Sequence, residues 1–437
     1  MPLERRNSKR PGPGRSGPAA QAQRTLSGGE LTELGRLLAQ TGLSGHFSGE
    51  ATLDGSELVI RSPHRLVEAV GTAQLLIGSG ASAIWQERAG EVNDVLVNSV
   101  DALHSLHSAH FVWQEGAYLE VGAEYLPVND FYPTRDGRQI LLCAGPPYMK
   151  LLNAYLDFFG CANNRESITA ATLRYTAHEL EEALAGIGVP GCRAFDRGEW
   201  LGHPQGQVLA ATPVIEIDKL ADGDPAPFTA HGIHPLSGMK VLDFTHVLAG
   251  PRSTQCLAEF GAAVLHVSSA MHADTLPQHL GVDTGKYCAY LDLSEEEQLK
   301  RMHELALDAD VFASSYRGSV SQRFHLTPEE LAARSRKGII VLSVNAYGHA
   351  GPWRERAGFD PNGQAASGFA AAEGAGVSSP NVSPVSYLAD LMSGYFGAAG
   401  MMAALLRRAR EGGSYHVKVS LARTSMWVQE LGMLGAE

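Results

Sequence analysis

The sequence predicts an α/β protein with a doubly wound, Rossmann-like domain and a smaller α/β domain, and three observations lead to this prediction. The chain has 437 residues, which favours two domains over one. Its second half opens with a strand, a helix and a second strand. A Pro-, Gly- and Asp-rich stretch, residues 218–238, separates the halves and is typical of a linker. With 44% hydrophobic and 19% charged residues, the composition is that of a globular protein.

The second half begins with a βαβ unit. Residues 241–244 form an apolar run of strand length, a Gly-Pro turn leads into the helical pattern RSTQCLAEFGA, and a second apolar run, AVLHV, follows at 263–267. Such a unit implies parallel strands covered by helices. The runs DADVFASS and GIIVLSVNAY continue the pattern, so we expect residues 236–437 to form the doubly wound domain. It contains no GxGxxG, which argues against ordinary dinucleotide binding.

The rest of the chain divides into three segments. Residues 1–30 are basic and rich in Pro, Gly and Ser, and they predict a disordered tail. Residues 31–220 hold the turn and strand YPTRDGRQILLCAG, then helical stretches and a final strand, and they predict the smaller α/β domain. Residues 221–235 are the predicted linker.

A weak internal repeat relates the two halves. Residues 83–106 resemble residues 404–428: both run from an apolar helix through a Gly/Glu break to a short V-x-V strand and another helix. Placing Ala83 opposite Ala404 puts Ala69 opposite Asp390, with Glu68 beside it. In this register only one copy carries a carboxylate at that point.

Charge and composition exclude several classes of function. The net charge of −12 and a pI near 5.8 argue against a nucleic-acid-binding protein. Five scattered cysteines without a CxxC spacing favour reduced thiols over disulfides or a zinc site. The longest apolar run has 16 residues, which is short for a membrane span, and the N-terminus shows no signal-peptide pattern. We therefore expect a soluble, cytoplasmic protein that binds neither membrane nor nucleic acid.

Three histidines invite the question of a metal site. His104, His107 and His110 recur at three-residue spacing, but on one helix all three cannot ligate the same ion well. No metal is therefore expected.

One carboxylate stands out near the C-terminus. In SPVSYLADLMSGYFGAAGMMAALLRR, residues 383–408, Asp390 precedes a long apolar run rich in Gly and Ala. An aspartate just before a helix is well placed as an N-cap, and the helix amides favour its ionised form. The small residues that follow permit close approach of backbone or ligand. From these residues alone, Asp390 is either a reactive carboxylate or only a cap, and the glycines serve either a ligand or helix packing.

Longer stretches of the second half resemble a known family. PLSGMKVLDFTHVLAGPRSTQCLAEFGAAVLHV, VLSVNAYGHAGPWRERAGFDPNGQAASG and the stretch around Asp390 resemble family III (CaiB/BaiF-type) CoA-transferases, in the family's order, over residues 236–430. In the first half, FYPTRDGRQILL and GVPGCRAFDRGEWLGHPQG resemble later segments of the same family. The family's second half therefore precedes its first, which indicates a circular permutation. The resemblance implies a CaiB/BaiF-type fold, coenzyme A or acyl-CoA as substrate, and an interlocked homodimer.

The resemblance also implies roles for individual residues. Asp390 matches the family's covalent nucleophile. The matched CoA-binding positions are His246 and Leu248 near the thiol, Lys286, and Tyr316, Arg317 and Arg323 near the nucleotide, where arginine suits a pyrophosphate. Without the resemblance, His246 would be an ordinary turn histidine and the lysine and arginines would be solvated charges.

The sequence departs from the family pattern at several of these places. Ser315 stands where the family has Asn, Gly318 and Ser319 replace Pro-Gly, and Ser268 and Ser269 replace Glu and Arg. These changes lie where phosphate contacts are expected.

The function predicted from the sequence is transfer of CoA between an acyl-CoA and a carboxylic acid through an aspartyl intermediate. A non-catalytic acyl-CoA-binding partner subunit is the alternative. Racemase or isomerase activity is disfavoured, because Phe359 stands where the family's racemases have a proton-carrying histidine.

Overall fold

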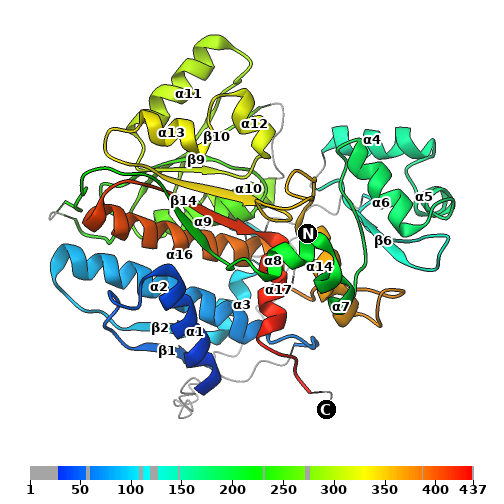
Figure 1. Ribbon diagram of the computed structural model, residues 1–437, viewed down its shortest axis with the longest axis horizontal. Coiled ribbons are helices and arrows are strands. Elements are labelled where there is room, and N and C mark those ends of the chain that lie inside the picture. The colour runs from blue at the N-terminus through cyan, green and yellow to red at the C-terminus, as the bar shows by residue number, and fades with distance from the viewer. Residues whose placement is uncertain are drawn as a thin grey trace, which may run out of the picture.

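A computed structural model describes residues 28–55, 60–107, 112–118, 126–145, 148–229, 232–270, 276–385 and 387–435. Almost all of the predicted tail, residues 1–30, lies outside these ranges, as does His110. Figure 1 shows three parts: a large sheet with its helices, a helical layer beneath it, and a smaller unit to one side.

The large sheet has seven strands in the order β11-β10-β9-β12-β13-β14-β8. The first six are parallel and follow the strand order of a doubly wound fold, which confirms the predicted fold class. The antiparallel β8 pairs with β14 at the edge. The strands are β8 (Glu216–Ala221), β9 (Lys240–Phe244), β10 (Ala263–Ser268), β11 (Tyr287–Tyr290), β12 (Val311–Ser314), β13 (Ile340–Asn345) and β14 (Ser414–Ser420).

Helices cover both faces of this sheet. Successive strand residues point to opposite faces: Val241 packs in the core with α9 and α16, and Leu242 in the core with α11 and α13. The helices of this half are α9 (Ala249–Glu259), α10 (Leu276–Asp283), α11 (Glu296–Asp308), α12 (Gly318–Arg323), α13 (Pro328–Arg334), α14 (Asp360–Ser367), α15 (Phe369–Glu373), α16 (Leu388–Glu411) and α17 (Leu421–Glu430).

The first described residues form a layer on α16 instead of joining the smaller unit. They comprise α1 (Gly28–Thr41), the parallel pair β1 (Ala51–Asp54) and β2 (Val95–Asn98), α2 (Leu66–Ala89) and α3 (Ser99–Ser105). Their apolar side chains belong to the same core as α16 and one face of the large sheet. The predicted single small domain over 31–220 is thus divided between two places.

The smaller unit has its own core. An antiparallel sheet of β5 (Asp130–Pro133), β6 (Gln139–Leu142) and β7 (Gly191–Arg193) packs against α4 (Met149–Phe159), α5 (Arg165–Thr172) and α6 (Ala177–Gly186). The hairpin β3 (Trp113–Gln114) and β4 (Ala117–Tyr118) precedes it, and α7 (Arg197–Gly202) and α8 (Pro204–Ala210) lead to the large sheet. Since β8 spans 216–221, the predicted boundary at 220 falls inside a strand of that sheet.

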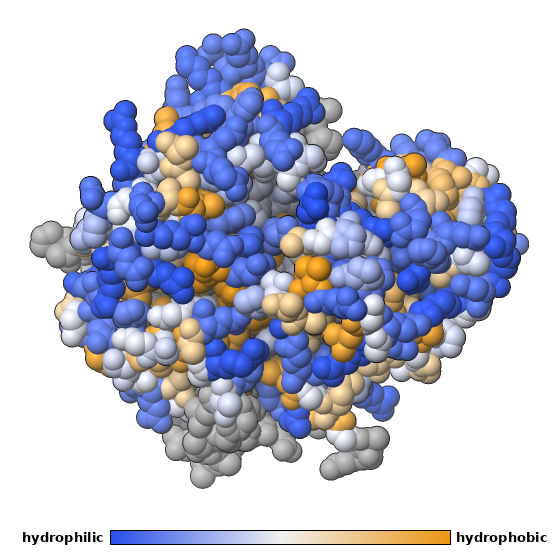
Figure 2. All heavy atoms as spheres, viewed as in Figure 1, coloured by the Kyte–Doolittle hydropathy of each residue, from blue (hydrophilic) through white to orange (hydrophobic). Residues whose placement is uncertain are grey.

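Two helices, α2 and α16, are long and apolar enough to span a bilayer by length and composition. Both run through the interior: 78% of the tested window of α2 and all of that of α16 are buried inside the protein. The face in Figure 2 is mainly hydrophilic, with apolar residues in small groups. The apolar character of both helices is therefore accounted for by core packing.

The structure corrects the register of the internal repeat by one residue. α2 and α16 each have 24 residues and begin at Leu66 and Leu388, an offset of 322. Each is followed by a glycine with positive φ, Gly90 and Gly412. With this offset Glu68, not Ala69, is the counterpart of Asp390. The sequence comparison was anchored on Ala83 and Ala404, whereas the V-x-V strands that begin at Val95 and Val417 have the offset of 322.

Candidate active site

A cavity of about 460 Å³ lies between the smaller unit and the carboxyl ends of β9 and β12. These neighbouring strands lead to opposite sides of the sheet, β9 to β10 and β12 to β13, so the cavity sits at the topological switch point where doubly wound folds bind ligands. Four of the predicted site residues line it together: His246, Tyr316, Arg317 and Asp390. The structure thus brings the proposed nucleophile and half of the predicted CoA-binding positions to one place.

Asp390 is the third residue of α16, so the prediction that it caps this helix is wrong. The N-cap is Tyr387, in a left-handed conformation with φ 59. Asp390 is 6% exposed and lies in the first turn, where the free N–H groups of the helix favour a negative charge. A buried carboxylate that opens onto a cavity at a helix N-terminus is suited to attack an electrophile while it is ionised.

A second carboxylate holds the start of α16. Asp360, the first residue of α14, accepts the backbone N–H of Asp390 at 3.0 Å, and its other oxygen accepts the amide of Gln364 at 2.5 Å. Asp360 is 2% exposed, and this burial raises its pKa to about 6. The sequence indicated a cap or turn role for Asp360, and the structure shows that it caps the helix of Asp390 rather than its own.

His246 is fixed by a residue that departs from the family pattern. Ser315 Oγ lies 2.9 Å from His246 Nδ1 and also accepts the His246 backbone N–H at 2.9 Å. The imidazole stacks on Tyr316 with ring centroids 4.4 Å apart. The next residue, Val247, has φ 65, which is strained for a β-branched side chain and occurs here in the cavity wall. Serine at 315 therefore joins the ends of β9 and β12.

The smaller unit closes the cavity with residues that the sequence analysis did not single out. Tyr148 stacks on Phe359 at 6.1 Å and lies 6.4 Å from the His246 ring. A Cβ on Gly145, whose φ is 73, would lie 2.6 Å from Phe359 Cζ, so only glycine permits this close approach. Lys150 of the smaller unit and Arg356, which lies between β13 and α14, also line the cavity. The available signal was the aromatic and basic pattern of PPYMK, which has no characteristic spacing.

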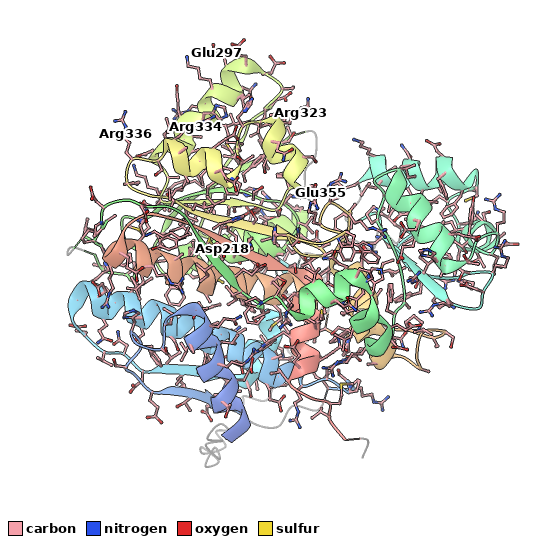
Figure 3. All side chains as sticks on the ribbon, viewed as in Figure 1. Asp218, Glu297, Arg323, Arg334, Arg336 and Glu355 are labelled. Atoms are coloured by element: carbon pink, nitrogen blue, oxygen red, sulfur yellow. The ribbon has the colours of Figure 1, made fainter. Side chains whose placement is uncertain are left out.

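Two predicted CoA-binding residues lie away from the cavity. Leu248 is 1% exposed and precedes α9 in the core. Arg323 is exposed at the end of α12, and Figure 3 shows it on the outer surface. Neither lines the cavity, whereas Arg317, at the start of the same helix, does.

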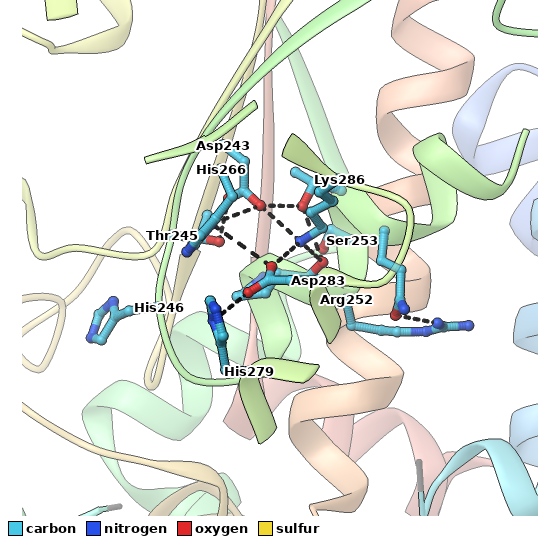
Figure 4. Close-up of polar contacts among 12 residues, drawn as sticks. Asp243, Thr245, His246, Arg252, Ser253, His266, His279, Asp283 and Lys286 are labelled. Carbon is cyan, nitrogen blue, oxygen red and sulfur yellow. Dashed lines mark hydrogen bonds and ion pairs between the residues drawn. The ribbon is translucent and has the colours of Figure 1, made fainter. Parts of the chain in front are cut away.

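Lys286 belongs to a buried cluster behind the site (Figure 4). Its ammonium donates to Asp243 at 2.9 Å, to the carbonyl of Pro251 at 2.8 Å and to Asp283 at 3.0 Å, and its side chain is fully buried. An ammonium has three N–H groups, so none is left for a ligand. The structure gives Lys286 a different role from the predicted CoA contact, because it ties β9, α9 and α10 together.

The same cluster contains a group of possible metal ligands. His266, His279 and Asp283 place donor atoms within 4.8 Å of one another. The Asp283 carboxylate is already paired with His279 at 2.6 Å and with Lys286 at 3.0 Å. Burial of Asp243 would raise its pKa, but Lys286 and His266 beside it hold the pKa well below the usual range. The charges are balanced by protein groups, which fits an ion-pair cluster.

Comparison with known proteins finds relatives of the half of the chain that contains Asp390. CoA-transferase family III matches residues 236–436. An acetyl-coenzyme A transferase, nodX, of Hypoxylon pulicicidum is 37% identical over 199 residues, covering 44% of this chain and 33% of that protein. An acyl-CoA transferase of Gibberella moniliformis is 31% identical over 272 residues, covering 60% and 48%. Human succinyl-CoA:glutarate CoA-transferase is 27% identical over 241 residues, covering 52% and 50%.

Among solved structures, a CaiB/BaiF family protein from Brucella suis is 27% identical, with a TM-score of 0.41, covering 45% of this chain and 55% of that one. The chain spans between a third and about half of the length of the curated relatives named above. The matched segment contains the six parallel strands of the large sheet, α16 and Asp390. Over residues 236–436, the chain is similar to CoA-transferase family III.

Proposed function

We propose that the protein moves CoA from an acyl-CoA to a carboxylic acid, with Asp390 as the nucleophile. The observation that carries the proposal is the position of Asp390: a buried carboxylate in the first turn of α16 that opens onto a cavity at the switch point of a doubly wound sheet. The named transferases among the relatives support the class of reaction. The donor, the acceptor and the covalent route belong to the proposal.

The proposed route has two exchanges at the aspartate. An Asp390 oxygen attacks the thioester carbon, the C–S bond breaks, and CoA leaves as a thiolate from a mixed anhydride. The thiolate then attacks the aspartyl carbonyl, which releases the first carboxylate and forms an aspartyl-CoA thioester. The acceptor carboxylate repeats these steps in reverse order, so a new acyl-CoA leaves and the Asp390 carboxylate is regenerated.

The other cavity residues support binding in this proposal. Arg317 offers a guanidinium for the CoA phosphates, and His246 on Tyr316 forms a rigid wall near Asp390. Tyr148 and Phe359 add an apolar wall beside His246, which would exclude water from the anhydride. Phe359 cannot carry a proton, so we propose acyl exchange rather than racemisation.

Hydroxylamine trapping tests this proposal. The protein is incubated with a panel of acyl-CoAs, quenched with hydroxylamine and mapped by mass spectrometry. A hydroxamate at Asp390 is expected in the wild type and not in Asp390→Asn. Glu68→Gln, which alters the repeat-equivalent carboxylate, is the matched control and should keep the adduct.

Two results would contradict the proposal. CoA binding without an adduct from any donor would favour a non-catalytic acyl-CoA-binding partner. Exchange of the α-hydrogen of an acyl-CoA in deuterated water, without acyl transfer, would favour an isomerase.

A further inference from the structure

The two halves of the chain contain matching units. In each, two parallel strands flank a 24-residue helix, and a second helix follows: β1, α2, β2 and α3 in one unit, and β13, α16, β14 and α17 in the other, where α14 and α15 stand between β13 and α16. The packing inside the units matches as well. A Cβ on Gly78 would lie 2.4 Å from Val95, and one on Gly400 would lie 2.5 Å from Val417, residues that again differ by 322. The resemblance therefore extends to the contact between helix and strand.

The two long helices lie side by side and run in the same direction (Figure 1). Near their starts, Tyr395 and Gln74 both bond to Ser105, at 2.6 and 2.8 Å. Near their ends, Arg410 donates to Glu87 at 2.6 Å. Residues at the same level of the two helices thus differ by 321 to 323, as in a parallel pair without stagger.

At the centre, the contact joins equivalent residues. A Cβ built on Gly80 would lie 3.3 Å from the Cβ of Met402, its counterpart at offset 322. Contact between the same position of two matching units is the property of a two-fold axis. Here the axis runs along the helix pair, with one strand pair beyond each helix.

Only one of the two units opens onto the cavity. Asp390 lines it together with His246 after β9 and with residues of the smaller unit. Glu68 lies 3.4 Å from Arg65, with its side chain 15% exposed, and lines none of the larger cavities of the described residues. The two units therefore share their arrangement of strands and helices, but only the α16 unit places its carboxylate in the cavity.

We infer that the α2 unit is a built-in partner of the α16 unit: a single chain supplies both members of the two-fold helix pair. α2 occupies the face of α16 that points away from the large sheet, so two copies of the chain do not pair through that face. This inference does not rest on the proposed function, because its test measures whether α2 packs on α16 of its own chain or of another chain and does not depend on activity.

Cysteine cross-linking of the full chain tests it. The variant carries Gly80→Cys and Met402→Cys in a Cys288→Ser background, because Cys288 is the exposed cysteine of the described residues. The distance between the two Cβ positions, 3.3 Å, is slightly below the roughly 3.5–4.5 Å of disulfides, so a small shift of the helices lets the bond form. On oxidation we expect an internal disulfide: the protein stays at the mass of one chain, 46.6 kDa, and peptide mapping joins residues 80 and 402.

Control variants distinguish a cross-link that depends on the register of the two helices from one formed by random collision of cysteines. Gly80→Cys with Ala398→Cys, one helical turn away, should cross-link much less. If the first pair disturbs folding, Glu87→Cys with Arg410→Cys, joined by a short bismaleimide instead of a direct disulfide, tests the exposed end of the same contact. A disulfide-linked dimer would show that α2 pairs between chains, and a folded variant without any cross-link would show that the helices are not in register. Either result would overturn the inference.

Discussion

At the scale of single residues, two arginines on one short helix separate a ligand contact from a surface charge. Arg317 lines the cavity and Arg323 is exposed outside it. A charged hydrogen bond contributes about 1.5–3 kcal/mol, so Arg317→Ala should raise KM for the acyl-CoA donor about 10- to 100-fold. Arg323→Ala is the matched control and should change KM less than about threefold. Steady-state kinetics at two salt concentrations measure KM for both variants. Equal increases in KM for Arg317→Ala and Arg323→Ala would contradict the assignment of this cavity as the CoA site.

Asp360 gives a prediction that combines activity and pH. Asp360→Asn can accept only one of the two hydrogen bonds that the carboxylate accepts, so the start of α16 shifts and kcat should fall about 10- to 100-fold. The folded pKa of about 6 lies above the usual value near 4. The stability contributed by Asp360 is therefore full below pH 4 and is lost as the pH rises through 6, roughly 3 kcal/mol in all.

Chemical unfolding at pH 4 and at pH 7 measures this difference. Between these pH values, the unfolding free energy of the wild type should fall by roughly 3 kcal/mol relative to that of Asp360→Asn. Glu181, whose pKa burial raises to about 7, is present in both proteins and cancels. Asp218→Asn, on an exposed side chain, controls for loss of charge. If the unfolding free energies of the two proteins changed equally with pH, the pKa of Asp360 would not be raised in the folded protein.

How far the sequence predicts the site differs from residue to residue. Asp390, His246, Tyr316 and Arg317 follow motifs whose spacing survives in this chain, and they meet at one cavity. Lys286 matches a motif equally well, yet its surroundings are set by Asp243 and Asp283, which reach it from other elements. A local sequence pattern cannot show that all three of its N–H groups are already taken.

At the scale of elements, the cluster around Lys286 is predicted to stabilise the join between β9, α9 and α10. Lys286→Met leaves two buried carboxylates without their cation and should lower the unfolding free energy at pH 7 by about 3–5 kcal/mol. Lys286 holds the pKa of Asp243 below its usual range, so the deficit should shrink as the pH is lowered towards about 4 and the variant's carboxylates take up protons.

Lys240→Met is the control, because Lys240 lies on β9, the strand that carries Asp243. Lys240 pairs with Asp308 at the surface, and its loss should lower the unfolding free energy far less than the loss of Lys286, because water screens an exposed ion pair. Thermal and urea unfolding measure both variants, and donor KM is measured beside them. A raised KM with unchanged stability in Lys286→Met would mean that the lysine contacts CoA directly after all.

The elements themselves were largely predictable where apolar runs and turns alternate. The βαβ unit at 241–267 appears as β9, α9 and β10, because a short apolar run, a turn and an amphipathic helix leave few other arrangements. The position of α2 was not predictable. The apolar residues of α2 could be buried against any neighbouring element. Only the tertiary packing shows that this neighbour is α16.

At the scale of the whole molecule, the site depends on two units with separate cores. The smaller unit packs around residues 128–189, while the large sheet and both long helices share another core. The cavity lies where they meet, with Tyr148 on one side and His246 and Asp390 on the other. The circular permutation inferred from the order of the motifs stays a prediction, although the arrangement explains how either order of the two halves could build the same cavity.

Because the cavity is shared, a bound ligand should protect both units from hydrogen exchange. With CoA at 100 times its Kd, binding adds about 2.7 kcal/mol to the stability of the native state. We expect slower exchange in residues 148–154 and 187–190 of the smaller unit together with residues 315–320 and 344–346 of the large one. Residues 66–89 of α2 lie outside this cavity and serve as the internal reference. In Arg317→Ala at the same CoA concentration, the protection should fall in both units together, to about 0.4–1.4 kcal/mol for a 10- to 100-fold weaker Kd. Protection confined to the large unit would mean that CoA binds to the sheet alone and that the smaller unit takes no part in holding it.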